Sequence, residues 1–227
     1  MIRFYYNLSP NPMKVALCLE ETGLPYEPVP VDVRKGEQFA HGYTAINPNS
    51  KVPAIVDGDV TVFDSNAILL HLAETTGRFG PAAGAKARAE MLSWLMFVAT
   101  GIGPFSGQCV HFRHFAPKGQ DYAVERYAFE ARRHWGVLDA HLTDRPFILG
   151  ADYSIVDMAA WGWARMVPFV LGEGAFADLR NVKRLLDTVN ARPAAQRAEA
   201  LKGRHAFKPE MDAEAKGHMF RAMKVEG

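Results

Sequence analysis

Two adjacent residues, Asp64 and Ser65, place an acid and a hydroxyl at the start of a predicted helix, within Phe63-Asp-Ser-Asn-Ala-Ile68. The unpaired N–H groups of a helix N-terminus, together with the helix dipole, favour an anionic guest such as a carboxylate. A small zwitterion would place its ammonium at Asp64 and its carboxylate on the hydroxyl and N–H of Ser65. The same residues can instead simply cap the helix, which is the commoner role of an isolated motif of this kind.

A second segment, Asn47-Pro-Asn-Ser-Lys-Val-Pro-Ala54, places Pro53 directly before an apolar strand. A proline at such a position usually serves a special backbone geometry. If the Val52–Pro53 bond is cis, the backbone N–H and C=O of Val52 turn outward and can pair with a peptide-like ligand in antiparallel fashion. The alternative is a simple turn before an edge strand, and this segment alone leaves both interpretations open.

The elements that must position these residues have mixed α/β patterning up to about Thr76. A proline marks the start of the first helix, a glycine-containing turn follows it, and Gly58-Asp59 has the spacing of a tight hairpin. We therefore predict an α/β domain over residues 1–78, with strand 2–6, helix 12–22, strand 26–33, hairpin strands 54–57 and 60–63, and helix 65–75.

A linker of small residues, 78–84, marks a domain boundary, and strand patterns are absent beyond it. Helical periodicity indicates an all-α domain over residues 85–202, with helices over 85–97, 122–142, 155–170 and 179–189. The tail, residues 203–227, is too short and polar to form a domain. We predict that it is an arm or a lid.

Bulk composition points to a small-molecule partner. The 227 residues are 48% hydrophobic, which is ample for a core, and 26 Lys+Arg against 25 Asp+Glu give a net charge of +1. The net charge therefore gives no electrostatic reason to expect binding to nucleic acid or to an anionic membrane. Because no secretory signal pattern and no apolar run of about 20 residues is present, we predict a cytoplasmic protein.

Cysteine and histidine spacing argues against a metal site or a disulfide framework. Cys18 and Cys109 lie far apart and outside any CxxC spacing. His111 and His114 have no acidic or cysteine neighbour at a ligand spacing. We expect no metal, and any sulfur chemistry would use a thiol that the protein binds.

The two motifs together, NPNSKVPAIVDG followed by FDSNAILLHLAE, resemble the glutathione site of the glutathione S-transferase superfamily in order and spacing. The resemblance implies an α/β thioredoxin-like N-terminal domain (βαβαββα) followed by an all-α C-terminal domain. It also implies that Val52 pairs with the cysteinyl backbone of glutathione, that Pro53 is cis, and that Asp64 and Ser65 bind the γ-glutamyl end. Gly150-Ala-Asp-Tyr-Ser-Ile-Val-Asp157 is similar to the family's buried helix-capping motif, so Ser154 and Asp157 are expected to be structural.

Other segments resemble the Nu class of that superfamily, namely Tyr5–Asn11, Lys35–Phe39, Gly107-Gln108, His114–Pro117 and Tyr122–Tyr127. This class is associated with reduction of small disulfides by bound glutathione or glutathione disulfide. Its members carry Thr-Pro-Asn where this chain has Ser9-Pro10-Asn11, and Glu where it has Asp64. By position, Gln38 and Lys51 would hold the glycine carboxylate and Arg133 would approach the ligand. The resemblance also implies a homodimer.

Such chemistry requires the protein to stabilise a thiolate, because glutathione near neutral pH is mostly protonated. Ser9 and Asn11 lie where the first strand meets the first helix, so their hydroxyl and amide, with helix N–H groups, are our candidates for that role. In isolation they would more often be helix caps. A tyrosine, Tyr5 or Tyr6, is the alternative activating group.

We therefore predict a glutathione-dependent transferase or thiol–disulfide oxidoreductase acting on small molecules, with glutathione as its co-substrate. One alternative is a glutathione-dependent ether or thioether lyase or a conjugating transferase, which would use the same thiolate. The other is a non-catalytic glutathione-binding or regulatory protein, for which Asp64 and Ser9 are the only departures from the family pattern.

Overall fold

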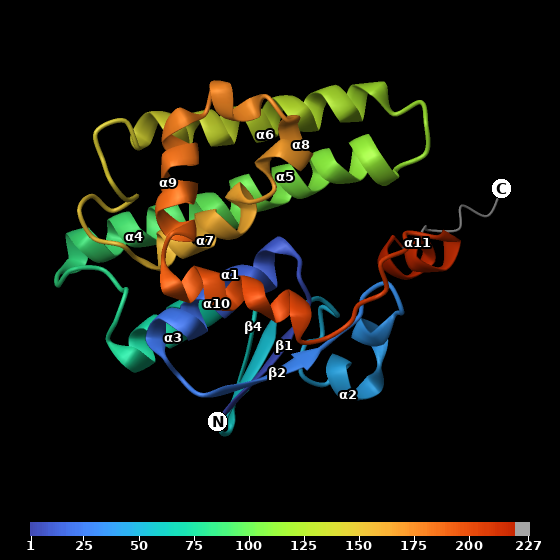
Figure 1. Ribbon diagram of the computed structural model, residues 1–227, viewed down its shortest axis with the longest axis horizontal. Helices are drawn as coiled ribbons and strands as arrows, with labels where there is room; N and C mark the ends of the chain where they lie inside the picture. Colours follow the sequence, from blue (N-terminus) through green and yellow to red (C-terminus); the bar gives the residue numbers. More distant parts are fainter. Residues whose placement is uncertain (221–227) are drawn as a thin grey trace.

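The computed structural model describes residues 1–220. The N-terminal domain contains a four-stranded mixed sheet in the order β2-β1-β3-β4 (Figure 1). The parallel pairing of β1 with β2 and the antiparallel hairpin of β3 and β4 confirm the predicted thioredoxin-like topology. The strands are β1 (Ile2–Tyr6), β2 (Tyr26–Pro30), β3 (Ala54–Asp57) and β4 (Val60–Phe63). The second strand ends at Pro30, earlier than predicted, because its pairing partner β1 ends at Tyr6.

Helix α1 (Pro10–Thr22) is the centre of the molecule, and most of its side chains are buried. It starts two residues before the predicted position, with prolines in its first turn, and ends at Gly23, whose φ of 72° favours glycine. It packs against α3 (Ser65–Thr76) of its own domain and against α7 and α10 of the helical domain. Between β2 and β3 the chain forms η1 (Glu37–Phe39) and α2 (His41–Thr44).

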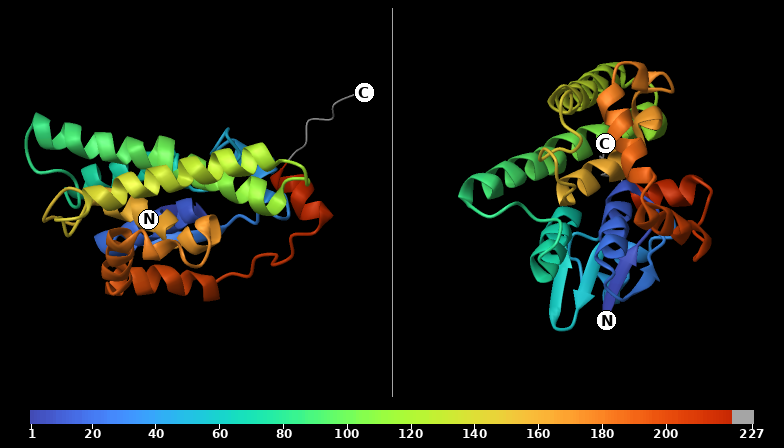
Figure 2. Two further views of the ribbon diagram at one scale, coloured as in Figure 1. Left: turned by 90° about the horizontal axis from the view of Figure 1, so that it is seen from above. Right: turned by 60° about the vertical axis from the view of Figure 1, so that its left-hand side comes forward.

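The second domain is built of helices, as predicted, with one isolated β-bridge between Phe147 and Gly150, and it lies over one side of α1 (Figures 1 and 2). The helix predicted over 155–170 is interrupted at Arg165-Met166, and Pro168 lies in the first turn of its second part. The elements are α4 (Ala85–Phe97), the π-helical turn η2 (Val98–Ile102), α5 (Gly103–Val110), the π-helical turn η3 (His111–Phe115), α6 (Asp121–His141), α7 (Ile155–Ala164), α8 (Val167–Leu171), η4 (Ala175–Ala177), α9 (Arg180–Asn190), α10 (Pro193–Ala200) and η5 (Leu201–Gly203).

A capping box starts α7, as predicted for Ser154 and Asp157. One Asp157 oxygen accepts from the N–H of Ile148 at 2.8 Å, and the other accepts from the N–H and hydroxyl of Ser154, each at 2.9 Å. Burial raises the pKa of Asp157 to about 6. Both residues therefore serve the core of the helical domain.

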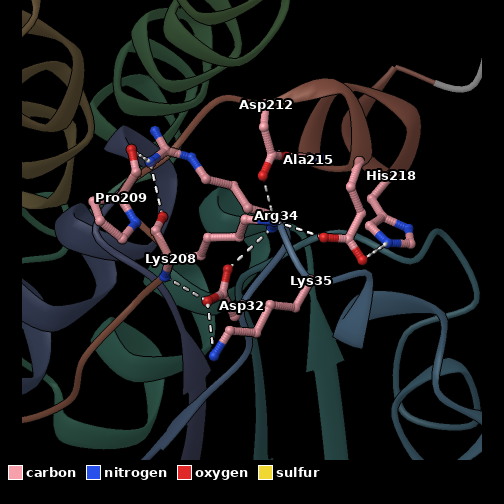
Figure 3. A network of polar contacts seen from close by, with 9 residues as sticks. Asp32, Arg34, Lys35, Lys208, Pro209, Asp212, Ala215 and His218 are labelled. Carbon is pink, nitrogen blue, oxygen red and sulfur yellow. Dashed lines mark hydrogen bonds and ion pairs between the residues drawn. The ribbon is translucent and has the colours of Figure 1, made fainter.

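The segment 204–220, which we call the C-terminal strap, returns from α10 to the N-terminal domain and carries α11 (Ala213–Met219) (Figure 1). The Tyr6 hydroxyl lies 3.0 Å from Nδ1 of His205, near the start of the strap. Further along, Arg34 donates to the carbonyls of Lys208 and Pro209, and Asp32 accepts from the N–H of Lys208 (Figure 3). The predicted tail thus docks on the loop after β2, and its residues 221–227 lie outside the described part.

No helix within residues 1–220 combines the length and apolarity needed to cross a bilayer. The boundary between domains 1–78 and 85–202 stays a prediction, since α1 packs closely against helices of both.

Candidate active site

Three segments leave the sheet at one edge. Tyr5 pairs with Ala54, which pairs in turn with Phe63, so the ends of β1 and β4 and the start of β3 lie side by side. The segment after β1, the residues before β3 and the turn before α3 are therefore neighbours. The Val52–Pro53 bond that precedes β3 is cis, as predicted.

Two adjoining cavities open at this edge. The smaller, about 390 Å³, has walls from the segment after β1, from η1 and the loop before it, from the loop before β3 and from the end of the strap, including Gln38, Lys51 and Val52. The larger, about 640 Å³, lies between the same segment, the strap and the side chains of Phe115 and Met166 from the helical domain. The residues shared by both walls are Asn7, Ser9, Val33 and Met219.

Ser9 therefore lies where the two cavities meet. It occupies the N-cap position of α1, yet its side chain makes no capping hydrogen bond. Its hydroxyl donates instead to Oδ1 of Asn7 at 2.6 Å, and the same oxygen accepts from the Ser9 N–H at 2.9 Å. The structure thus fixes the hydroxyl beside both cavities and not on the helix end.

Asn11 is half-buried and lies outside the walls of both cavities. Its Oδ1 accepts a hydrogen bond from the indole N–H of Trp163, in α7, at 3.0 Å. Because indole N–H can only donate, this contact orients the amide, with its oxygen toward Trp163 and its NH₂ group turned away. Two amide donors are thereby held in a fixed direction beside the α1 N-terminus.

Asp64 caps α3, which is the alternative considered for it. Its Oδ1 accepts from the N–H groups of Asn66 at 2.8 Å and Ala67 at 3.4 Å, while the residue itself is exposed and has φ of 66°. One carboxylate oxygen therefore serves the helix. Ser65, directly behind it, is buried, and neither residue lies in the walls of the two cavities.

Gln38 and Lys51 meet in the smaller cavity with Val52. Lys51 is exposed, whereas Gln38 is buried and its Oε1 has no hydrogen-bond partner among residues 1–220. The Gln38 amide NH₂ makes only long contacts, 3.3 Å to the carbonyl of Val33 and 3.4 Å to that of His218. A buried amide with an unused oxygen is a group that a ligand can satisfy.

Arg133 does not join the other predicted site residues. It lies on α6, where its Nε donates to a carboxylate oxygen of Glu130 at 2.9 Å. That contact holds the pKa of Glu130 below its usual range. Within one chain, Arg133 is outside the walls of both cavities.

The tyrosine and cysteine alternatives lack the surroundings that they need. Tyr6 is buried in the core, which raises the pKa of its hydroxyl, and Tyr5 packs against Tyr43. Burial raises the pKa of the Cys18 thiol to about 12 and also raises that of Cys109, so both thiols stay protonated at neutral pH. In the described residues, no cluster of three or more His, Cys, Asp or Glu side chains is arranged to hold a metal ion.

Comparison with known proteins assigns both halves of the chain. The glutathione S-transferase N-terminal domain matches residues 2–74, and the glutathione S-transferase C-terminal domain matches residues 106–193. The chain is also 43% identical, over 170 residues, to the disulfide-bond oxidoreductase YfcG of Escherichia coli K12, covering 72% of this chain and 79% of that protein. The chain belongs to the glutathione S-transferase family.

Solved structures of glutathione transferases have the same fold. One from Pseudomonas fluorescens Pf-5, with two glutathione bound, is 38% identical with a TM-score of 0.82, covering 87% of this chain and 91% of that one. Another from Pseudomonas putida, with one glutathione disulfide bound per subunit, is 34% identical with a TM-score of 0.81, covering 89% and 92%.

In this transferase fold, sequence reasoning missed two parts of the cavity walls. Asn7, which holds Ser9, follows β1 directly, and a polar residue immediately after an apolar strand was the available signal. His218 and Met219 reach the smaller cavity from α11. No local pattern marks them, because their position depends on the docking of the strap.

Proposed function

We propose that this protein is a glutathione-dependent thiol–disulfide oxidoreductase of small molecules. The observation that carries the proposal is the place of Ser9, in the wall shared by two adjoining cavities. Glutathione would occupy the smaller cavity with its sulfur at Ser9, and the second substrate would enter the larger one. The relative named as a disulfide-bond oxidoreductase and the structural neighbours with glutathione or its disulfide bound support the activity and the ligand.

The protein's task in this reaction is to stabilise the thiolate form of glutathione. The Asn11 amide and the Ser9 hydroxyl, whose proton would turn from Oδ1 of Asn7 to the sulfur, lie at the start of α1, where the helix dipole adds a positive potential. The thiolate attacks one sulfur of the substrate disulfide, which gives a glutathione mixed disulfide and expels the other sulfur as a thiolate. A second glutathione thiolate then attacks the glutathione sulfur of the mixed disulfide, giving glutathione disulfide and the second product thiolate.

We assign the rest of glutathione to the neighbouring groups. The backbone of Val52, next to Pro53, would pair with the cysteinyl unit, and Gln38 and Lys51 would hold the glycine carboxylate through amide donors and charge. Asp64 and Ser65 would bind the γ-glutamyl end. The Gln38 NH₂ group, which makes only the two long contacts described above, and the position of the Ser65 N–H in the first turn of α3 support these roles.

A homodimer in the cytoplasm completes the proposal. One face of α6 exposes Tyr122, Phe129 and Val137 at helical spacing, with Arg133 on the same face. A second copy covering this stripe would place Arg133 at the interface, which is the setting in which it could approach a ligand of the neighbouring subunit.

A second candidate reaction is conjugation of glutathione to an apolar electrophile. It uses the same thiolate, and the apolar walls of the larger cavity favour it, including Leu8, Phe115, Met166 and Phe207.

The test is steady-state reduction of 2-hydroxyethyl disulfide by glutathione, coupled to glutathione reductase, beside conjugation to a chlorinated nitrobenzene. Strong disulfide turnover with feeble conjugation is expected. Cys18→Ala and Cys109→Ala serve as matched controls that keep the activity if the reacting thiol belongs to glutathione. Measurable glutathione binding with neither activity would contradict the oxidoreductase and favour a binding protein.

A further inference from the structure

One lysine is completely enclosed by the protein. Lys14, in the second turn of α1, is 1% exposed, and no other lysine or arginine is buried within residues 1–220. Its Nζ donates to the side-chain oxygen of Asn66, in α3, at 2.9 Å. A neutral amide, and not a carboxylate, is therefore the partner of this ammonium group.

The helices packed around α1 seal this position. A Cβ placed on Gly162 of α7 would lie 3.1 Å from Cβ of Lys14 and 2.5 Å from the carbonyl oxygen of Pro10, so only glycine permits this approach. Asp64 is the charged group that acts on Lys14. The other charged groups of β1, α1, α3, α7 and α10 are exposed or have partners of their own: Arg3, Glu74, Glu20 with Arg197, Glu21 with Arg192, His71 with Asp57, Arg165 with Glu199, and Asp157 with Ile148 and Ser154.

Lys14 lies directly behind the turn proposed to bind the γ-glutamyl end. Asn66 joins the two, since its side-chain oxygen accepts from Lys14 while its backbone N–H and side-chain NH₂ donate to Oδ1 of Asp64, at 2.8 and 3.3 Å. Burial lowers the pKa of Lys14 to about 7, and the Asp64 carboxylate opposes that shift. Near neutral pH the amine is thus divided between its two forms, and a nearby negative charge will decide between them.

We propose that Lys14 is a positioning residue for the γ-glutamyl end of glutathione, and that binding of the ligand's α-carboxylate at Ser65 draws a proton onto Lys14. This inference rests on the proposed glutathione site. The carboxylate brings its charge to the residue next to Asn66, where the low dielectric of the interior strengthens its attraction to an ammonium group. The ligand's own ammonium faces the exposed Asp64, where water screens it.

The proton uptake can be measured by titration calorimetry with S-methylglutathione, which has no ionisable thiol, in phosphate and in Tris buffer. The difference in heat between the buffers gives the protons exchanged on binding. If the ligand raises the pKa of Lys14 by about one unit, wild-type protein takes up roughly half a proton per chain near pH 7.5. Uptake falls toward zero at about pH 6, because Lys14 is then already charged in the free protein.

Two variants test whether Lys14 is the group that takes up the proton. Lys14→Met should abolish the uptake and weaken binding severalfold. His218→Gln, which removes the imidazole in the wall of the smaller cavity, should keep the uptake. If Lys14→Met fails to fold, the pH profile of proton uptake by the wild type and the uptake by His218→Gln still test whether Lys14 is the acceptor.

Binding without uptake, proton release, or uptake that is unchanged in Lys14→Met or lost in His218→Gln would overturn the role of Lys14 and leave the glutathione site intact. A failure of S-methylglutathione to bind would remove the proposed site itself, and this inference with it.

Discussion

The γ-glutamyl end and the glycine end of the proposed glutathione site are built from different kinds of contact. At the γ-glutamyl end, Ser65 and Asn66 belong to a regular helix, are buried, and are backed by Lys14 in the core. At the glycine end, the buried Gln38 lies in the single turn η1 and the exposed Lys51 lies in the loop before β3, and the strap supplies part of the wall.

The strap is held by two buried side chains, Tyr6 and Asp32, and by further polar contacts near solvent, part of which Figure 3 shows. The half-buried Arg34 donates to two backbone carbonyls of the strap, and Lys208 forms ion pairs with the exposed carboxylates of Asp212 and Glu214. Polar contacts count for more where water is excluded, whereas exposed ion pairs contribute about 0–1 kcal/mol each. From this comparison we expect the buried γ-glutamyl end to determine the affinity for glutathione and the strap to determine how readily glutathione enters the site. The following substitutions test this expectation. The first lies at the proposed position of the glutathione sulfur, between the two ends.

Asn11→Ala should have the largest effect, a fall in kcat of about 100-fold with glutathione affinity nearly unchanged, because its amide is proposed to meet the sulfur charge and not the peptide. Steady-state kinetics and calorimetry separate the two quantities. Trp163→Phe is the matched variant, since it removes the hydrogen bond that orients the amide, and it should cause a smaller loss of kcat. An unchanged rate in Asn11→Ala would exclude its role.

Ser65→Ala comes next, with glutathione affinity weakened about tenfold, the effect of losing one buried donor to a carboxylate. Calorimetry measures it directly. Thr61→Ala, on the exposed strand that leads into the same turn, is the control and should bind normally. If Ser65→Ala binds as tightly as wild type, the buried end does not set affinity and the comparison fails.

Arg34→Met should have the smallest effect, a rise of about threefold in KM for glutathione, because it loosens the strap without touching the buried end. Raising the salt concentration should weaken the remaining exposed contacts of the strap. Lys208→Met is the control, since it removes only exposed ion pairs and leaves the backbone contact of residue 208 with Asp32 in place. A loss of glutathione affinity in Arg34→Met as large as that in Ser65→Ala would show that the strap contributes to affinity as much as the γ-glutamyl end does, against the expected difference between them.

Local signals were enough to predict much of this architecture from the sequence. The hairpin at Gly58 depends on turn chemistry that is complete in a short segment. The cis bond before Pro53 and the capping box of Ser154 were expected from the resemblance to the glutathione S-transferase superfamily, since segment 47–54 alone leaves a simple turn open. The interruption of the helix between α7 and α8, before Pro168, was harder to predict, because apolar periodicity continues across it.

What sequence reasoning could not supply depends on contacts between distant segments. Tyr6 meets His205, and Arg34 meets Lys208, only because the strap returns to the first domain. The orientation of Asn11 likewise depends on Trp163 in another domain. The roles of the predicted site residues stay predictions, and Arg133 in particular has no place in the cavity of a single chain.

The close crossing of α1 and α7 at Gly162 also bears on synthesis of the protein. A ribosome releases α1 and the sheet well before α7 and α10, so the first domain leaves the exit tunnel with the central helix uncovered on that side. Until α7 docks, the Lys14 side chain lacks the cover that Gly162 and its neighbours give it. During synthesis the apolar face of α1 that the helical domain covers is therefore exposed until the second half of the chain has followed.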